Sequence, residues 1–188
     1  MTRIILRWLN APIFVLMVVV GLALQSSLFS FYPLLYLQPD LLLIVAVWCG
    51  LRRPFIEGGV IVLLVSALGE VHGGAPQGLF EIAYMCVYLL VRLLAKVIVV
   101  GNFGSVIALT LGSSILWKLI CLLFLYLMGK ADNQWKHTVS LIFPSAVITG
   151  TFSVWVYRWL EWFDWKTYKS PRAQQLLEDE LLIEGEGF

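Results

Sequence analysis

One lysine lies in the middle of an apolar run, where an ionisable side chain is costly and is usually paired or functional. Lys118 is about 10 residues from the end of its run, so about 15 Å deep at a rise of about 1.5 Å per residue. Two acids could reach it: Glu81 near the start of the preceding apolar run, and Glu70 at the end of another. We predict an ion pair of Lys118 with Glu81 or Glu70. The pair would either fix how the helices assemble, which we favour, or line a polar cavity for a small ligand or ion.

Residues suited to enzymatic chemistry are few. His72 and His137 lie in different loops, and the chain has no HExxH, GxSxG or phosphate-binding P-loop pattern. Glu70 and His72 could bring a carboxylate near an imidazole, but polar residues at helix ends often do so without a function. The cysteines lie singly in apolar runs and are interpreted as small packing residues: Cys49, Cys86 and Cys121. We therefore expect no enzyme, no metal and no cofactor.

The composition indicates an integral membrane protein. Of the 188 residues, 60% are hydrophobic and 13% are charged, and the mean hydropathy is +0.87. Soluble domains average about 45–50% apolar and about 25% charged residues, so lipid must solvate much of this chain. A spanning helix needs about 20 apolar residues, which leaves room for about six crossings. The net charge of +1 gives no indication of a nucleic-acid partner.

Six apolar segments, separated by Gly, Pro and polar residues, predict an all-α fold with six transmembrane helices. They cover approximately residues 11–32, 40–51, 56–71, 78–100, 104–128 and 138–163. Residues 1–163 would form one transmembrane domain. Residues 164–188 would form a cytoplasmic tail, first amphipathic and then acidic.

The second and third segments are short, so they form either a re-entrant hairpin or two true crossings. A hairpin would place Arg52 and Arg53 at membrane depth, at about 2.5–3.5 kcal/mol each. With six crossings, only Lys130 and Lys136 face outward, and cytoplasmic loops carry the excess of basic residues. The cytoplasmic set is Arg3, Arg7, Arg52, Arg53, Arg92, Lys96, Arg158, Lys166, Lys169 and Arg172. We therefore predict six crossings with both termini cytoplasmic.

Two groups of side chains are expected at the level of the inner-leaflet headgroups. Arg92 and Lys96 are one helical turn apart and would reach lipid phosphates together. Aromatic side chains crowd the end of the last segment, as expected for an interfacial belt: Trp155, Tyr157, Trp159, Trp162, Trp165 and Tyr168. Both groups predict contact with membrane lipid.

The stretch from Pro39 to Leu94 carries a series of motifs in a fixed order. A Pro-Asp-Leu-rich helix begins at Pro39 and Asp40 and ends at the basic turn of Arg52 and Arg53. The next apolar helix ends in an acid, and a turn of the pattern small-Pro-x-Gly-Leu follows. This order resembles the rod-shape-determining protein MreD family, over less than a third of the chain. The later motif residues are Gly69, Glu70, Pro76 and Gly78, and the family more often has Asp where Glu70 stands.

The resemblance implies a function that the residues alone do not give. Members of the family are six-helix proteins of the bacterial inner membrane and non-enzymatic subunits of the cell-wall elongation machinery. They are expected to bind the bitopic protein MreC, and through it the MreB filament and the RodA–transpeptidase synthase. The family is also similar in fold to the substrate-binding subunits of energy-coupling-factor transporters. A small-molecule-binding membrane subunit is therefore the alternative. It would need a cavity with convergent polar groups.

Overall fold

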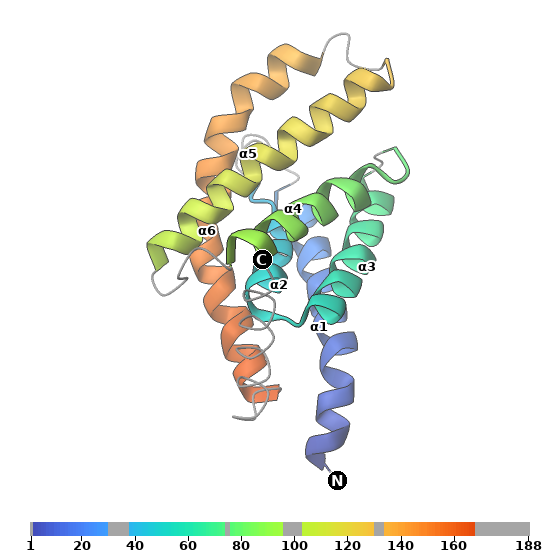
Figure 1. Cartoon of the computed structure of the whole chain (residues 1–188), viewed down its shortest axis with the longest axis vertical. Helices are drawn as coiled ribbons and strands as arrows, with labels where there is room; N and C mark the ends of the chain where they lie inside the picture. The colour runs from blue at the N-terminus through green and yellow to red at the C-terminus, as the bar shows by residue number, and fades with distance from the viewer. Residues whose placement is uncertain (1, 30–37, 74–75, 96–102, 130–133, 168–188) are drawn as a thin grey trace.

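The computed structural model describes residues 2–29, 38–73, 76–95, 103–129 and 134–167. Within these ranges the chain forms helices and no strand, which confirms the predicted all-α class (Figure 1). The helices are α1 (Thr2–Leu28), α2 (Leu41–Arg52), α3 (Phe55–Gly73), α4 (Leu79–Ala95), α5 (Phe103–Leu127) and α6 (Gln134–Thr167).

Three of these helices contain a stretch long and apolar enough to cross a membrane. The stretches are Asn10–Leu28 in α1, Phe55–Gly73 in α3 and Gly104–Phe124 in α5. α2 is also apolar but has only 12 residues, or about 18 Å at about 1.5 Å per residue. The chain is therefore a helical membrane protein, and the number of its crossings is taken up below.

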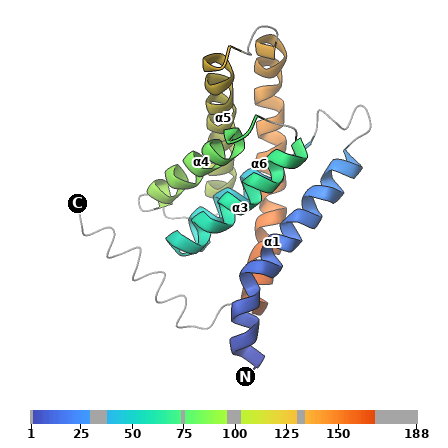
Figure 2. The same cartoon turned by 90° about the vertical axis from the view of Figure 1, so that its right-hand side faces the viewer.

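The short helix α2 lies at the centre of the helical body. Every residue from Leu42 to Leu51 is buried, and all five other helices contact α2. α5 and α6 form an antiparallel pair (Figures 1 and 2). The start of α1 and the end of α6 lie at the same end of the molecule, which is drawn at the bottom of both figures and is called the lower end. A helix that is apolar on all sides is expected in such a central position.

Polar residues define both ends of α2. Asp40 is the N-cap, and its Oδ1 accepts a hydrogen bond of 3.0 Å from the backbone N–H of Leu43. Arg53 is the C-cap; it has extended backbone angles, and its own N–H donates to the carbonyl of Cys49. An acid at the N-terminus and a base at the C-terminus both interact favourably with the helix dipole.

Glycines allow α3 to approach its neighbours closely. A Cβ atom at Gly69 would lie 2.3 Å from Cδ1 of Leu42 on α2. A Cβ atom at Gly58 would lie 3.0 Å from the hydroxyl of Tyr88 on α4 and 3.2 Å from the carbonyl oxygen of Cys49. Lipid is as apolar as the side chains, so the hydrophobic effect does not drive transmembrane helices together. Close packing at small residues such as these glycines takes its place.

The last helix extends further than the sequence predicts. We expected a cytoplasmic tail to begin at Asp164, but α6 continues to Thr167 and buries Asp164. The carboxylate belongs to the interior because it pairs with Arg53, as described below. The predicted amphipathic and acidic part of the tail lies at 168–188, outside the described residues.

Candidate functional site

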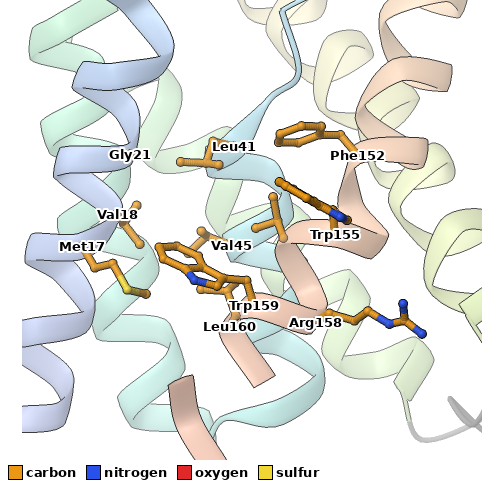
Figure 3. A pocket seen from close by; sticks show the side chains of 11 residues that line it. Met17, Val18, Gly21, Leu41, Val45, Phe152, Trp155, Arg158, Trp159 and Leu160 are labelled. Atoms are coloured by element: carbon orange, nitrogen blue, oxygen red, sulfur yellow. The ribbon is translucent and has the colours of Figure 1, made fainter. Parts of the chain in front are cut away.

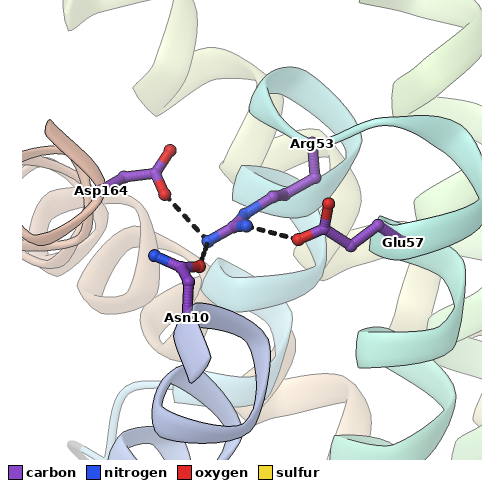
Figure 4. Close-up of polar contacts among 4 residues, drawn as sticks. All are labelled: Asn10, Arg53, Glu57 and Asp164. Atoms are coloured by element: carbon purple, nitrogen blue, oxygen red, sulfur yellow. Dashed lines mark hydrogen bonds and ion pairs between the residues drawn. The ribbon is translucent and has the colours of Figure 1, made fainter. Parts of the chain in front are cut away.

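At the lower end of α2, one buried arginine connects three polar side chains, each from a different helix (Figure 4). The side chain of Arg53 is 0% exposed. Its Nη1 donates to Oε1 of Glu57 on α3 at 2.5 Å. Its Nη2 donates to Oδ1 of Asn10 on α1 at 2.6 Å and to Oδ1 of Asp164 on α6 at 2.9 Å. Asn10, Arg53, Glu57 and Asp164 are called the Arg53 cluster.

Two aromatic rings and a second arginine also contact Arg53. The guanidinium carbon of Arg53 lies 5.2 Å from the ring centre of Trp48 and 5.4 Å from that of Phe14, within the range of cation–π attraction. Nη1 of Arg92 donates to the backbone carbonyl of Arg53 at 2.9 Å. The two rings stack with their centres 5.1 Å apart. The guanidinium of Arg53 is therefore enclosed by two carboxylates, one amide and two aromatic rings.

Two expectations about basic residues are corrected here. Arg53 was expected in a cytoplasmic turn, but its side chain is buried, and two carboxylates and an amide accept hydrogen bonds from its two Nη atoms. Arg92 was expected to reach lipid phosphates, but it is 3% exposed and turned toward Arg53. Its predicted companion, Lys96, lies outside the described residues. Arg52 is the half-buried member of the basic turn: it pairs with Glu161 at 2.7 Å, and its Nε donates to the hydroxyl of Tyr157 at 2.6 Å.

At the upper end of α2, Asp40 joins α2 to α4 and α6. The hydroxyl of Tyr84 on α4 donates to the carboxylate of Asp40, 3.0 Å from each oxygen. The backbone N–H of Asp40 donates to Oγ1 of Thr149 on α6 at 3.1 Å. The hydroxyl of Thr149 in turn donates to the carbonyl of Ser145. One residue that caps a helix therefore also connects three helices.

The lysine at membrane depth belongs to the same region. Lys118 on α5 donates to the hydroxyl of Ser145 on α6, and Asp40 is the acid whose charge acts on it. The predicted partners are elsewhere, so the pairing of Lys118 with Glu70 or Glu81 is wrong. We call Asp40, Tyr84, Lys118, Ser145 and Thr149 the Asp40 network.

Glu70 has a different role, at the start of α4. Its Oε1 accepts from the N–H of Gly78 at 2.6 Å, and its Oε2 accepts from the N–H of Phe80 at 3.0 Å. The helix itself offers no acceptor to the N–H groups of its first turn, so Glu70 supplies one, next to the positive end of the helix dipole. Glu81 lies half-buried in that turn. His72 is exposed and contacts Ser26 of α1 at 3.1 Å, so it forms no pair with Glu70.

The other residues of the family-like motif also position helices. The carbonyl of Pro39 accepts a hydrogen bond from Gln25 of α1 at 2.5 Å. Pro76 accepts from the N–H of Leu79 at 3.2 Å and so forms the turn before α4. Gly78 in that turn has a φ of 83°, a conformation that favours glycine. Gly69 provides the close contact with Leu42.

Two apolar grooves border α1. The first, between α1 and α6 with α2 as its floor, is a cavity of about 610 Å³ lined by residues such as Met17, Gly21, Val45 and Trp159 (Figure 3). The second, between α1 and α3, has a volume of about 650 Å³. Four tryptophans on α6 are more than half exposed, as expected for an interfacial belt: Trp155, Trp159, Trp162 and Trp165.

Within the ranges that the structure describes, no three His, Cys, Asp or Glu side chains are grouped so that they could bind a metal ion. Asn10, Glu57 and Asp164 were not predicted as partners of Arg53. Asn10 and Asp164 are polar residues at the edges of apolar runs, which was a signal. Nothing in the sequence paired them with Arg53, because they lie 43 and 111 positions from it.

Comparison of the chain with models of protein families, with curated proteins and with solved structures gave no significant match.

Proposed function

We propose that this chain is a non-catalytic scaffold subunit of the bacterial cell-wall elongation machinery, similar to the MreD family. It would bind an MreC-like single-span protein, and through it the MreB filament and the RodA–transpeptidase synthase. The observation that carries the proposal is the use made of the motif residues between Pro39 and Leu94. Their polar groups form helix caps, turns and contacts between helices, as in a protein whose task is to present a fixed surface.

The motif residues support this proposal individually. The Asp40 carboxylate receives the N–H of Leu43 and the hydroxyl of Tyr84, and the Glu70 carboxylate receives two backbone N–H groups. Arg53 is surrounded by acceptors and rings. A catalytic acid, base or nucleophile needs to reach a bound substrate, whereas these groups already have partners within the protein.

We further propose six crossings of the inner membrane with both termini cytoplasmic. The direction of the helices alternates along the chain, and the start of α1 and the end of α6 share the lower end (Figure 2). α2 would complete its crossing inside the protein, because all its neighbours are helices of the same chain. An impermeant thiol reagent applied from outside should label a cysteine placed at Gly74 or Asn133. Labelling at Phe55 would contradict this topology.

The function is tested by depletion and by purification. Depletion in a rod-shaped host should give rounded, swollen cells in which wall synthesis is no longer confined to the side wall. Purification of the tagged full chain in mild detergent should recover the MreC-like protein of the same genome in a stoichiometric amount. Cells that stay rod-shaped, together with a preparation that contains no single-span partner, would rule the scaffold out.

The Asp40 network favours the second candidate, a small-molecule-binding subunit like those of energy-coupling-factor transporters. Polar side chains from α2, α4, α5 and α6 converge there, as a binding site would require. In this case the purified protein should carry a bound small molecule, and depleted cells should fail to take up a vitamin. Substitution of Lys118 by Met should then release the molecule without loss of cell shape.

A further inference from the structure

We infer that the groove between α1 and α3 is the docking site of an apolar single-span helix that carries a Lys or Arg at its cytoplasmic end. The inference rests on the proposed function and adds to it the surface and the chemistry of the partner. The groove is called the α1–α3 groove, and its lining residues are Ala11, Pro12, Val15, Leu16, Val19, Glu57, Val60, Ile61, Leu64 and Leu68.

The shape of the groove suits a helix. On α3 its lining follows a helical repeat from Glu57 through Val60 and Leu64 to Leu68. The 11 steps from Glu57 to Leu68 span about 16 Å, or three turns, at about 1.5 Å per residue. Val60, Leu64 and Leu68 are between 45% and 51% exposed. Two such rows of side chains, one on α1 and one on α3, leave between them the groove into which the row of a third helix packs.

Charge selects the partner at the lower end of the groove. Glu57 is the only charged residue in the lining, and its side chain is 28% exposed. Its Oε1 accepts from Arg53, and Oε2 has no hydrogen-bond partner among the described residues. In the proposed topology this end faces the cytoplasm. A single-span protein carries its excess of Lys and Arg at that side of its helix, so the charges are complementary.

The α1–α6 groove lacks this polar end. Its lining is apolar except for Arg158, whose guanidinium points away from the Met17 and Val18 side of the groove (Figure 3). Apolar contact alone gives no preference for protein over lipid, because lipid tails are as apolar as the groove. We therefore assign the helix to the α1–α3 groove.

The first test introduces a bulky side chain into the groove of the full chain, co-expressed with the MreC-like protein of the same genome. Leu64→Trp should reduce the recovered partner about fivefold or more, because it fills the groove where the helix packs. Leu123→Trp is the matched control, since Leu123 is 56% exposed on α5 and does not line the groove. It should leave recovery unchanged, and both variants should be equally abundant in the membrane.

The second test examines proximity and charge. A photo-crosslinking amino acid at position 64 should attach to the transmembrane segment of the partner, and the same amino acid at position 123 should not. Glu57→Gln keeps an oxygen for Arg53 but removes the charge. The decrease in recovered partner that Glu57→Gln causes should not add to the decrease caused by neutralising the basic residue at the cytoplasmic end of the partner's helix.

The outcomes separate this inference from the proposed function. Equal recovery with Leu64→Trp and Leu123→Trp would show that the partner binds another surface, and the scaffold function would stand. Crosslinks from position 64 only to lipid, or to a second copy of this chain, would likewise overturn the groove assignment. If the partner is not recovered even with the unsubstituted chain, the proposed function and the groove assignment fall together.

Discussion

The two ends of α2 are stabilised by charges of opposite sign and in different ways. At the lower end, Arg53 is fully buried, and its partners come from three helices: Asn10 on α1, Glu57 on α3 and Asp164 on α6. At the upper end, Asp40 is only partly buried. Its carboxylate receives the local N–H of Leu43 and one hydroxyl from α4. The lower end combines a local ion pair with Glu57, a long-range ion pair with Asp164 and a long-range hydrogen bond to Asn10. The upper end is a helix cap with further contacts.

This difference predicts where the fold is vulnerable. A buried ion pair contributes little net free energy when intact, but the loss of one partner strands the other in a medium that solvates charge poorly. A capped helix end that loses one contact keeps its remaining hydrogen bonds, so the cost is smaller. We therefore expect substitutions at the lower end to reduce stability more than those at the upper end.

The largest effect is expected for Arg53→Met. Two carboxylates and one amide would lose their shared donor inside the protein, which should destabilise the fold by about 3–5 kcal/mol. The measurement is the midpoint of thermal unfolding in mild detergent, or the yield of monodisperse protein. Arg52→Met is the control, because the pair of Arg52 and Glu161 is more than a third exposed at the arginine and is worth at most about 1 kcal/mol. Similar losses for the two arginine variants would contradict the difference between the ends.

The second prediction concerns the contact of α3 with the upper part of α2. Gly69→Ala would place a methyl group 2.3 Å from Cδ1 of Leu42, and overpacking of this kind costs about 1–3 kcal/mol. Leu42→Ala makes room for the methyl group but has its own cost of about 2–5 kcal/mol, so the loss in the double variant should be smaller than the sum of the two single losses. Gly112→Ala on α5 meets nothing within 4 Å, so its thermal midpoint should be unchanged or slightly raised. If the losses of Gly69→Ala and Leu42→Ala are additive, the contact is not the cause.

The third prediction concerns the start of α4. Glu70→Ala would leave the N–H groups of Gly78 and Phe80 without their acceptor, at a cost of about 1–2 kcal/mol. Glu70→Gln keeps one acceptor oxygen and should lose about half as much. The comparison variant is Glu81→Ala, in the first turn of the same helix, which should be close to neutral. A Glu81→Ala variant as unstable as Glu70→Ala would assign the stabilisation to charge near the helix rather than to the two hydrogen bonds.

The same contrast explains which parts of the structure could be predicted. Hydropathy, with Gly and Pro as boundaries, predicted six helices, and five of them lie within about five residues of those observed. The first helix is the exception, because α1 begins at Thr2 and was predicted to begin near residue 11. Asp40 was recognisable as an N-cap because its acceptor serves Leu43, three residues away. The partners of Arg53 were not recognisable, because Asn10 and Asp164 are brought to it only by the packing of α1 and α6 on α2. The pairing of Lys118 failed for the same reason: depth could be estimated from the sequence, but the direction of its side chain toward Ser145 could not.

The smallest effect is expected in the Asp40 network. In Lys118→Met, Ser145 loses one donor, while Asp40 keeps its hydrogen bonds to Leu43 and Tyr84. Hydrogen bonds between transmembrane helices are worth about 0.6 kcal/mol on average, so the loss should stay below about 1 kcal/mol. A double-mutant cycle with Asp40→Asn measures whether the two charges act on each other. The combined loss should be smaller than the sum of the single losses, because each substitution removes the same attraction. Additive losses would mean that Lys118 serves Ser145 alone. The two ends of α2 would then differ even more, since the upper end would contain no charge pair.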